Sequence, residues 1–166
     1  NKNFGRFNVK TQEVTLIKQL ELSGSLGTNP GPYLIYYFVD SNFYMSDQNL
    51  SSVYKITPDG ECEWFCGSAT QKTVQEALFA QPNGMTVDED GNFYIVDGFK
   101  GYCLRKLDIL DGYVSTVAGQ VDVASQIDGT PLEATFNYPY DICYDGEGGY
   151  WIAEAWGKAI RKYAVE

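Results

Sequence analysis

Hydrophobic and polar positions follow a sixteen-residue pattern that recurs at residues 32–47, 82–97 and 139–154. Each copy opens with a proline, carries an aromatic pair eleven and twelve positions later, and closes with an acid, which is Asp47, Asp97 or Glu154. The starts of the copies are 50 and then 57 residues apart. Self-similarity at such a period indicates one supersecondary unit per repeat.

Each copy predicts a pair of antiparallel strands. In the second copy an apolar run with Met85 and Val87 meets the turn cluster Asp90-Gly91-Asn92, and a second apolar run, residues 93–96, follows. A Gly-containing turn between two β-rich runs is typical of a hairpin. Apolar and basic runs beyond the acid predict a third strand at residues 53–56, 104–107 and 160–163. A fourth follows in the first two copies, ending at Gly67 and Gly119.

Four antiparallel strands in every ~50 residues are typical of a β-propeller blade. We therefore predict an all-β fold, a β-propeller of four-stranded antiparallel blades, of which residues 1–166 form a part. The blades are expected at residues 32–67 and 82–119, with an incomplete blade at 139–163. Residues 1–22 are expected to form the outer hairpin of a preceding blade.

The inner strands of the blades are predicted to supply the core, because both of their faces pack against neighbouring blades. The apolar positions expected to be buried on them are Ile35, Tyr37, Met85, Val87, Ile142 and Tyr144. A matching lead-in segment precedes the second and third copies and carries Phe79 and Phe136. We expect these two rings to lie between adjacent blades.

From the lead-in phenylalanine onward, these residues resemble NHL repeats, a β-propeller family. The pattern F-x-x-P, an apolar strand, a D-G turn, an aromatic-apolar segment closed by an acid, and an apolar-R-K strand runs from Phe136 to Lys162 and nearly as well from Phe79 to Lys106. The resemblance covers most of the chain beyond residue 30 and implies a six-bladed ring. Two whole blades cannot close a ring, so the remaining blades come from a longer chain, which we favour, or from a second copy.

Charge and hydropathy limit the classes of partner that this chain is expected to bind. The formal net charge is −10, and the 12 Lys and Arg residues are scattered along the repeats, which disfavours nucleic acid as a partner. The longest apolar run, residues 33–39, is far shorter than the roughly 20 residues that span a bilayer. No membrane insertion is therefore expected.

The chain contains no histidine, which excludes a zinc site of the usual histidine type and a Ser-His-Asp triad. The four cysteines lie in predicted strands without a CxxC pair, so we expect buried free thiols; they are Cys62, Cys66, Cys103 and Cys143. No catalytic residue, metal site or cofactor is predicted.

The closing acids of the three copies are expected to be structural. A carboxylate where the second strand turns into the third can accept backbone N–H groups of that turn, and repetition in every blade fits such a role. Arg105 and Arg161 are natural ion-pair partners for these acids. A catalytic acid, by contrast, need occur only once.

Candidate ligand-binding residues are those at which the copies differ. The loops between second and third strands share one face of a propeller with the crossovers, so we expect Phe99, Tyr102 and Trp156 on this face. They could stack on sugar rings or hold a peptide, or alternatively pack against a neighbouring crossover. Asp141, the one charged residue among three equivalent positions near the central channel, is either a ligand contact or a solvated carboxylate.

Two functions remain open from the sequence. The first is a non-catalytic binding module that presents an aromatic and acidic rim to a glycan or protein ligand, outside the cytoplasm and as part of a larger chain. The second is a hydrolase or lyase whose catalytic residues lie in blades outside this segment. The absence of histidine and of a non-repeated acid pair favours the first.

Overall fold

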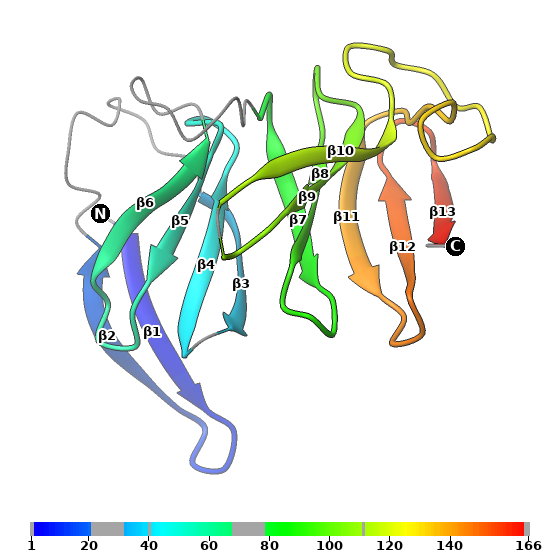
Figure 1. Ribbon diagram of the computed structural model, residues 1–166. Coiled ribbons are helices and arrows are strands. Elements are labelled where there is room, and N and C mark those ends of the chain that lie inside the picture. The colour runs from blue at the N-terminus through cyan, green and yellow to red at the C-terminus, as the bar shows by residue number, and fades with distance from the viewer. Residues whose placement is uncertain (1, 21–31, 40, 68–78, 111, 165–166) are drawn as a thin grey trace.

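The computed structural model describes residues 2–20, 32–39, 41–67, 79–110 and 112–164, with the backbone alone described for residues 2–7, 17–20 and 32–39 (Figure 1). All thirteen elements in these ranges are β-strands, arranged in four antiparallel sheets. No helix among the described residues is long and apolar enough to cross a membrane.

The strands pair in chain order within each sheet. The first sheet joins β1 (Lys2–Asn8) to β2 (Glu13–Leu20). The second contains β3 (Pro32–Val39), β4 (Asn42–Asp47), β5 (Ser52–Ile56) and β6 (Cys62–Gly67). The third contains β7 (Pro82–Val87), β8 (Phe93–Asp97), β9 (Cys103–Leu107) and β10 (Val114–Gly119). The fourth contains β11 (Pro139–Tyr144), β12 (Gly149–Glu154) and β13 (Ala159–Ala164).

The sheets stand next to one another as blades of a β-propeller (Figure 1), because the inner strand β7 contacts β3 of the blade before it and β11 of the blade after it. Sheets β3–β6 and β7–β10 are four-stranded blades, whereas the described part of the third blade has three strands. The predicted all-β propeller fold is therefore confirmed. The assignment of the β1–β2 hairpin to a preceding blade stays a prediction, and residues 21 and 22 lie outside the described residues.

Aspartates close the lower turns between the inner two strands of the second and third blades. The Asp88 carboxylate accepts the backbone N–H groups of Asp90 and Asn92, at 3.0 and 2.8 Å. Asp145 does the same in the third blade for Glu147 and Gly149. Because a short acceptor side chain stabilises a tight turn, the D-G clusters of the sequence pattern end the inner strands at these points.

The core lies between the blades. One cluster joins Tyr44 and Val53 of the first blade to Met85 and Phe93 of the second, with Phe79 among them. A second cluster joins strands of the second and third blades around Phe136; its other members are Tyr94, Val96, Leu104, Ala118, Ile142, Tyr150 and Ile152. The lead-in phenylalanines therefore lie between adjacent blades, as expected.

Some burial predictions need correction. Met85 and Ile142 are buried, whereas Val87 and Tyr144, toward the lower ends of their strands, are half-buried. The side chains of Ile35 and Tyr37 lie outside those that the structure describes.

The four cysteines are free thiols, but they are not all buried. Burial raises the pKa of the Cys66 and Cys103 thiols to about 12. Cys62 is half-buried, and Cys143 is exposed on β11. The prediction of four buried thiols was therefore wrong for these two, because their strands border solvent in the described chain.

Candidate functional site

The repeated acids fasten each inner strand to the segment that leads into it. The Asp97 carboxylate, at the end of β8, accepts the backbone N–H groups of Ala80 and Gln81, with the shortest distance 2.7 Å. Glu154 at the end of β12 accepts the N–H of Asn137 at 3.3 Å. The predicted role for these acids was structural and so is the one observed. The N–H partners of Asp97 and Glu154, however, lie just before the proline that opens each copy, and not in the turn that follows the acid.

Asp47 follows the predicted pattern. Its Oδ1 atom accepts the N–H groups of Asn49 and Leu50 in the β4–β5 turn, at 2.9 and 3.0 Å. In the third blade the predicted ion pair is present, with Nη1 of Arg161 lying 3.0 Å from Oε1 of Glu154. The acids are thus committed to holding the upper ends of the blades.

Three aromatic side chains gather on this upper end, and we call them the aromatic platform: Phe99, Tyr138 and Trp156. Phe99 belongs to the β8–β9 turn, Trp156 to the β12–β13 turn, and Tyr138 directly precedes β11. The Tyr138 and Trp156 rings are stacked with centroids 4.7 Å apart, and Phe99 meets Trp156 edge-on at 5.7 Å. Trp156 is 55% exposed and Phe99 39%. A joined and solvent-facing aromatic surface therefore spans the second and third blades.

Tyr138 is held in a backbone conformation that is uncommon for a bulky residue. Its φ is 58°, in the left-handed region, although a residue before proline favours extended backbone. Its carbonyl accepts the N–H of Ala155 at 2.9 Å, which fixes the lead-in to the β12–β13 turn. Strained residues persist where the surroundings over-determine them, and they cluster at functional sites.

The residues predicted from the sequence separate into two groups. Phe99 and Trp156 lie together on the exposed upper end, as expected. Tyr102 is buried, with its ring 6.2 Å from that of Phe99, so it supports the platform instead of facing solvent. Sequence reasoning missed Tyr138, because its equivalent in the previous repeat is Gln81 and only its proximity to the other rings reveals it.

Asp141 is exposed and lies near the start of β11, outside the ring contacts of the platform. Its Oδ1 atom accepts the N–H of the adjacent Ile142 at 2.9 Å. A Cβ atom on Gly84 would collide with the Asp141 carboxylate, so β7 and β11 approach closely here. Asp141 thus remains free to accept a hydrogen bond from solvent or a ligand at its other oxygen.

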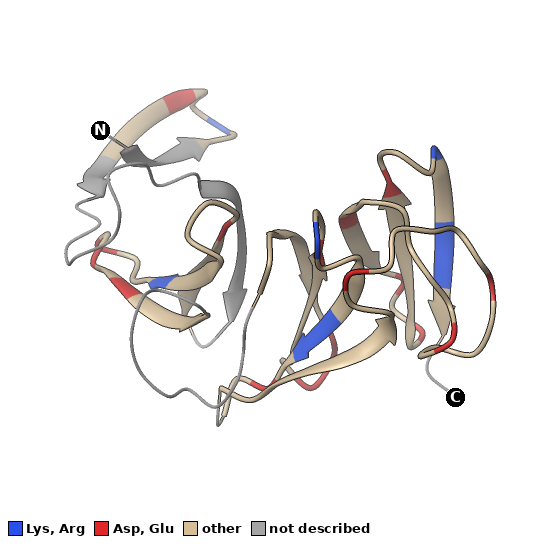
Figure 2. Cartoon of the chain, turned by 90° about the horizontal axis from the view of Figure 1, so that it is seen from above, with Lys and Arg blue, Asp and Glu red and all other residues tan. Residues whose placement is uncertain are grey.

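The charges near the platform are few. Lys100 Nζ lies 5.9 Å from the centre of the Phe99 ring. Acidic and basic residues are otherwise dispersed over the described strands and turns, as the view from above shows (Figure 2). Among the described residues, no group of three or more acids or cysteines is placed to hold a metal ion.

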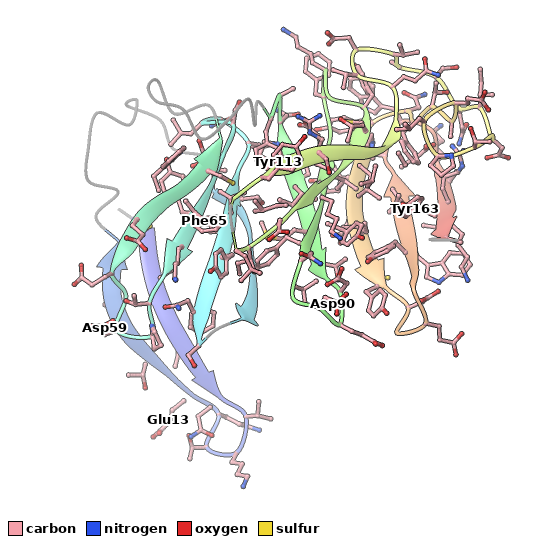
Figure 3. The ribbon with its side chains drawn as sticks, viewed as in Figure 1. Glu13, Asp59, Phe65, Asp90, Tyr113 and Tyr163 are labelled. Atoms are coloured by element: carbon pink, nitrogen blue, oxygen red, sulfur yellow. The ribbon has the colours of Figure 1, made fainter. Side chains whose placement is uncertain are left out.

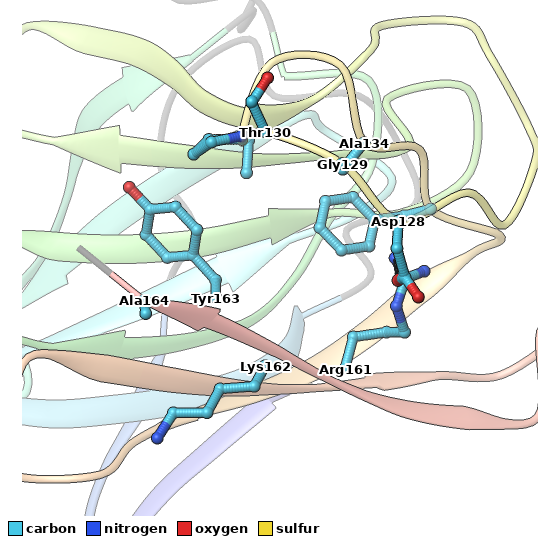
Figure 4. A pocket seen from close by; sticks show the side chains of 11 residues that line it. Asp128, Gly129, Thr130, Ala134, Arg161, Lys162, Tyr163 and Ala164 are labelled. Carbon is cyan, nitrogen blue, oxygen red and sulfur yellow. Dashed lines mark hydrogen bonds and ion pairs between the residues drawn. The ribbon is translucent and has the colours of Figure 1, made fainter. Parts of the chain in front are cut away.

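A cavity of about 650 Å³ runs along β13, the last strand of the third blade (Figure 4). Its lining includes Ala118, Phe136, Tyr163 and the Arg161 side chain. The Arg161 guanidinium is already bound to Glu154 and Asp128, and it lies over the Phe136 ring. Lys162 also lines the cavity, and its Nζ atom is paired with Asp145 at 3.2 Å, so both cations of the lining have acidic partners.

Comparison with known proteins places this geometry among solved propellers. No protein-family model and no curated protein match the chain. A crystal structure of a protein of unknown function from Bacteroides thetaiotaomicron is 97% identical with a TM-score of 0.88. That match covers 100% of this chain and 43% of the other chain.

More distant structures share the fold alone. An auxiliary nutrient binding protein from Bacteroides ovatus is 19% identical over 98% of this chain and 43% of its own, with a TM-score of 0.74. Virginiamycin B lyase from Staphylococcus aureus is 16% identical over 99% of this chain and 49% of its own, with a TM-score of 0.60. The chain therefore spans less than half the length of the propeller proteins that it matches.

Proposed function

We propose that this chain is part of a non-catalytic NHL-type propeller, six-bladed when complete, that presents the aromatic platform to a glycan or protein ligand outside the cytoplasm. The remaining blades belong to the rest of a longer protein. The observation that carries the proposal is the gathering of Phe99, Tyr138 and Trp156, which come from separate turns, into one exposed surface.

The contrast between repeated and non-repeated positions supports a binding role. Asn49, Phe99 and Trp156 occupy the same place, two residues after the closing acid. The acids themselves are buried and bonded, whereas the residues at this place are exposed. Aromatic faces on a rigid turn offer a large contact area at a low entropic cost of binding, which suits them to a ligand surface.

The similarities to other proteins do not decide between binding and catalysis, because fold does not fix function. Two of the similar structures are named auxiliary nutrient binding proteins, and others are named streptogramin or virginiamycin B lyases. A hydrolase or lyase with its catalytic residues in other blades is the alternative. It predicts turnover of a substrate by the longer protein, which a binding module lacks.

The replacement Trp156→Ala tests the platform. Removing the stacked ring should weaken ligand binding at least about fivefold, because one well-placed aromatic contact contributes about 1 kcal/mol or more. Binding would be measured by affinity electrophoresis and calorimetry, both for this chain and for the longer 97%-identical protein. The ligands would be soluble polysaccharides and cell-surface proteins of the organism that carries the longer protein. The melting temperature should change little, since Trp156 is 55% exposed.

The matched control is Tyr113→Ala. Tyr113, labelled in Figure 3, is 52% exposed and directly precedes β10, at the opposite end of β9 from the β8–β9 turn that carries Phe99. It should leave binding unchanged. Equal loss of binding in both variants, or unfolding of the Trp156 variant, would contradict a ligand-binding platform.

A further inference from the structure

The amide of Asn83 is buried beneath the platform without a hydrogen-bond partner among the described residues. Asn83 is fully buried, and neither its Oδ1 nor its Nδ2 atom has a hydrogen-bond partner in the part of the chain that the structure describes. Most buried polar side chains in folded proteins are satisfied, so such a group calls for an explanation. Either a bound molecule forms hydrogen bonds with the amide, or the unpaired amide lowers the stability of the folded protein.

The neighbours of Asn83 place its amide between the two segments that carry the platform. Its Nδ2 atom lies so close to Gly98 that a Cβ there would collide with it, and the Pro139 carbonyl lies near the same point. Gly98 precedes Phe99, and Pro139 follows Tyr138. The unsatisfied amide therefore points into the junction from which two of the three platform rings arise.

The backbone of Asn83 is fixed independently of its side chain. Its carbonyl oxygen accepts a hydrogen bond from Ser46 Oγ of the first blade at 2.8 Å, in a buried position. Neither equivalent residue, Tyr33 or Tyr140, is an amide. Asn83 thus belongs to the positions at which the repeats differ, like the platform itself.

A second amide, that of Gln81, contacts the same two segments that carry the platform. The Oε1 atom of Gln81 accepts the Phe99 N–H at 3.3 Å and lies 3.4 Å from the Tyr138 hydroxyl. This arrangement leaves the two N–H donors of Gln81 Nε2 to other partners. Two uncharged amides, with donors and acceptors, therefore lie under an aromatic surface.

We propose that Asn83, with Gln81, is the hydrogen-bonding half of a site for a neutral sugar, and this inference rests on the binding function proposed above. The sugar ring stacks on the platform through its C–H groups, and because Asn83 is fully buried, a hydroxyl reaches its amide through one ordered water. A hydroxyl both donates and accepts, which matches an amide, whereas a carboxylate only accepts. The net charge of −10 further disfavours anionic sugars.

The test replaces Asn83 by leucine, which has the same branching and number of side-chain heavy atoms and no polar atom. Binding of neutral gluco-, manno-, xylo- and galacto-oligosaccharides is measured by calorimetry, with uronic-acid oligosaccharides for comparison. Asn83→Leu should weaken binding of the neutral oligosaccharide that the parent protein selects by about five- to tenfold. The melting temperature should stay the same or rise, because the replacement removes an unsatisfied buried amide.

The outcomes separate this proposal from the one on which it rests. If Trp156→Ala weakens binding and Asn83→Leu does not, the platform binds the ligand but the Asn83 amide makes no hydrogen bond that contributes to binding. If the melting temperature of Asn83→Leu falls clearly, the amide has a structural partner, and the proposal is overturned. Gln81→Leu, at a half-buried position, is the second variant should the first fail to fold, and it should also weaken sugar binding. Preference for the uronic-acid series would overturn the neutral class.

Discussion

Asp97 illustrates how a buried charge fastens one segment to another. Burial raises the pKa of its carboxyl above the usual range, while the N–H groups of Ala80 and Gln81 and the nearby Arg105 act in the opposite direction. Burial has the largest effect, so ionised Asp97 is costly, and it is retained for the two main-chain bonds that it accepts.

The variant Asp97→Ala should lower the free energy of unfolding by about 2–4 kcal/mol, because it leaves two part-buried N–H groups without their acceptor. Asp97→Asn keeps one acceptor oxygen and should cost less. Urea unfolding monitored by fluorescence measures both. Equal losses in the two variants would show that hydrogen bonding is not what Asp97 contributes.

The same residue predicts a pH dependence. An acid whose pKa is raised by folding binds protons more tightly in the folded state, so its own contribution to stability falls as pH rises from the unfolded pKa, about 3.9, through the folded value. The parent protein should therefore lose relative stability across this window compared with Asp97→Asn. Unfolding curves at several pH values, compared between the two proteins, measure the difference. Parallel pH profiles would contradict the raised pKa.

At the scale of single residues, the sequence predicts chemistry better than placement. The aromatic identities of Phe99 and Trp156 and their place after the acid were readable. The burial of Tyr102 and the recruitment of Tyr138 were not, because both depend on positive φ angles of 48° and 58° that the pattern does not encode. The unsatisfied Asn83 amide likewise appears only once neighbouring blades are in place.

At the scale of elements, the strands were predictable because the same signals for strand ends occur in each repeat. The proline, the D-G turn and the closing acid mark strand ends, so the bounds of β7, β8, β11 and β12 follow the pattern. The acid's hydrogen-bond partners were not predictable, since they lie seventeen and sixteen residues away in sequence.

Strand β11 offers a test of the core between blades. Ile142 is buried between the second and third blades, so Ile142→Ala should lower the free energy of unfolding by about 2–5 kcal/mol. Ile160→Ala on β13 is the control, because Ile160 is 66% exposed and its truncation should cost within about 0.5 kcal/mol. Denaturant unfolding measures both. A loss below about 1 kcal/mol for Ile142→Ala would show that this position is not core.

At the scale of the whole molecule, one face of the third blade is exposed, whereas the equivalent faces of the first and second blades are covered by the next blade. Tyr44 and Tyr94, which are 1% and 5% exposed, pack against the next blade, whereas Trp151 at the same place in the repeat is 43% exposed. The chain covers 43% of the 97%-identical protein from Bacteroides thetaiotaomicron. The rest of such a protein is long enough to supply a blade that covers Trp151.

In that longer protein the residue equivalent to Trp151 should be shielded from solvent. Hydroxyl-radical footprinting with mass spectrometry compares it with the equivalent of Trp156, which serves as an internal standard because the platform should stay exposed. Trp151 is expected to be oxidised several times more slowly. Similar oxidation of the two residues would show that no further blade packs on this face.

The bonds that Asp97 accepts come from main-chain N–H groups, which every residue except proline carries. Changing the side chain at position 80 or 81 to any residue but proline therefore preserves the hydrogen bonds between Asp97 and this segment. Residues of the neighbouring turns can therefore be exchanged without loss of these main-chain bonds. In a lineage built from such repeats, ligand preference is expected to diverge faster than blade geometry.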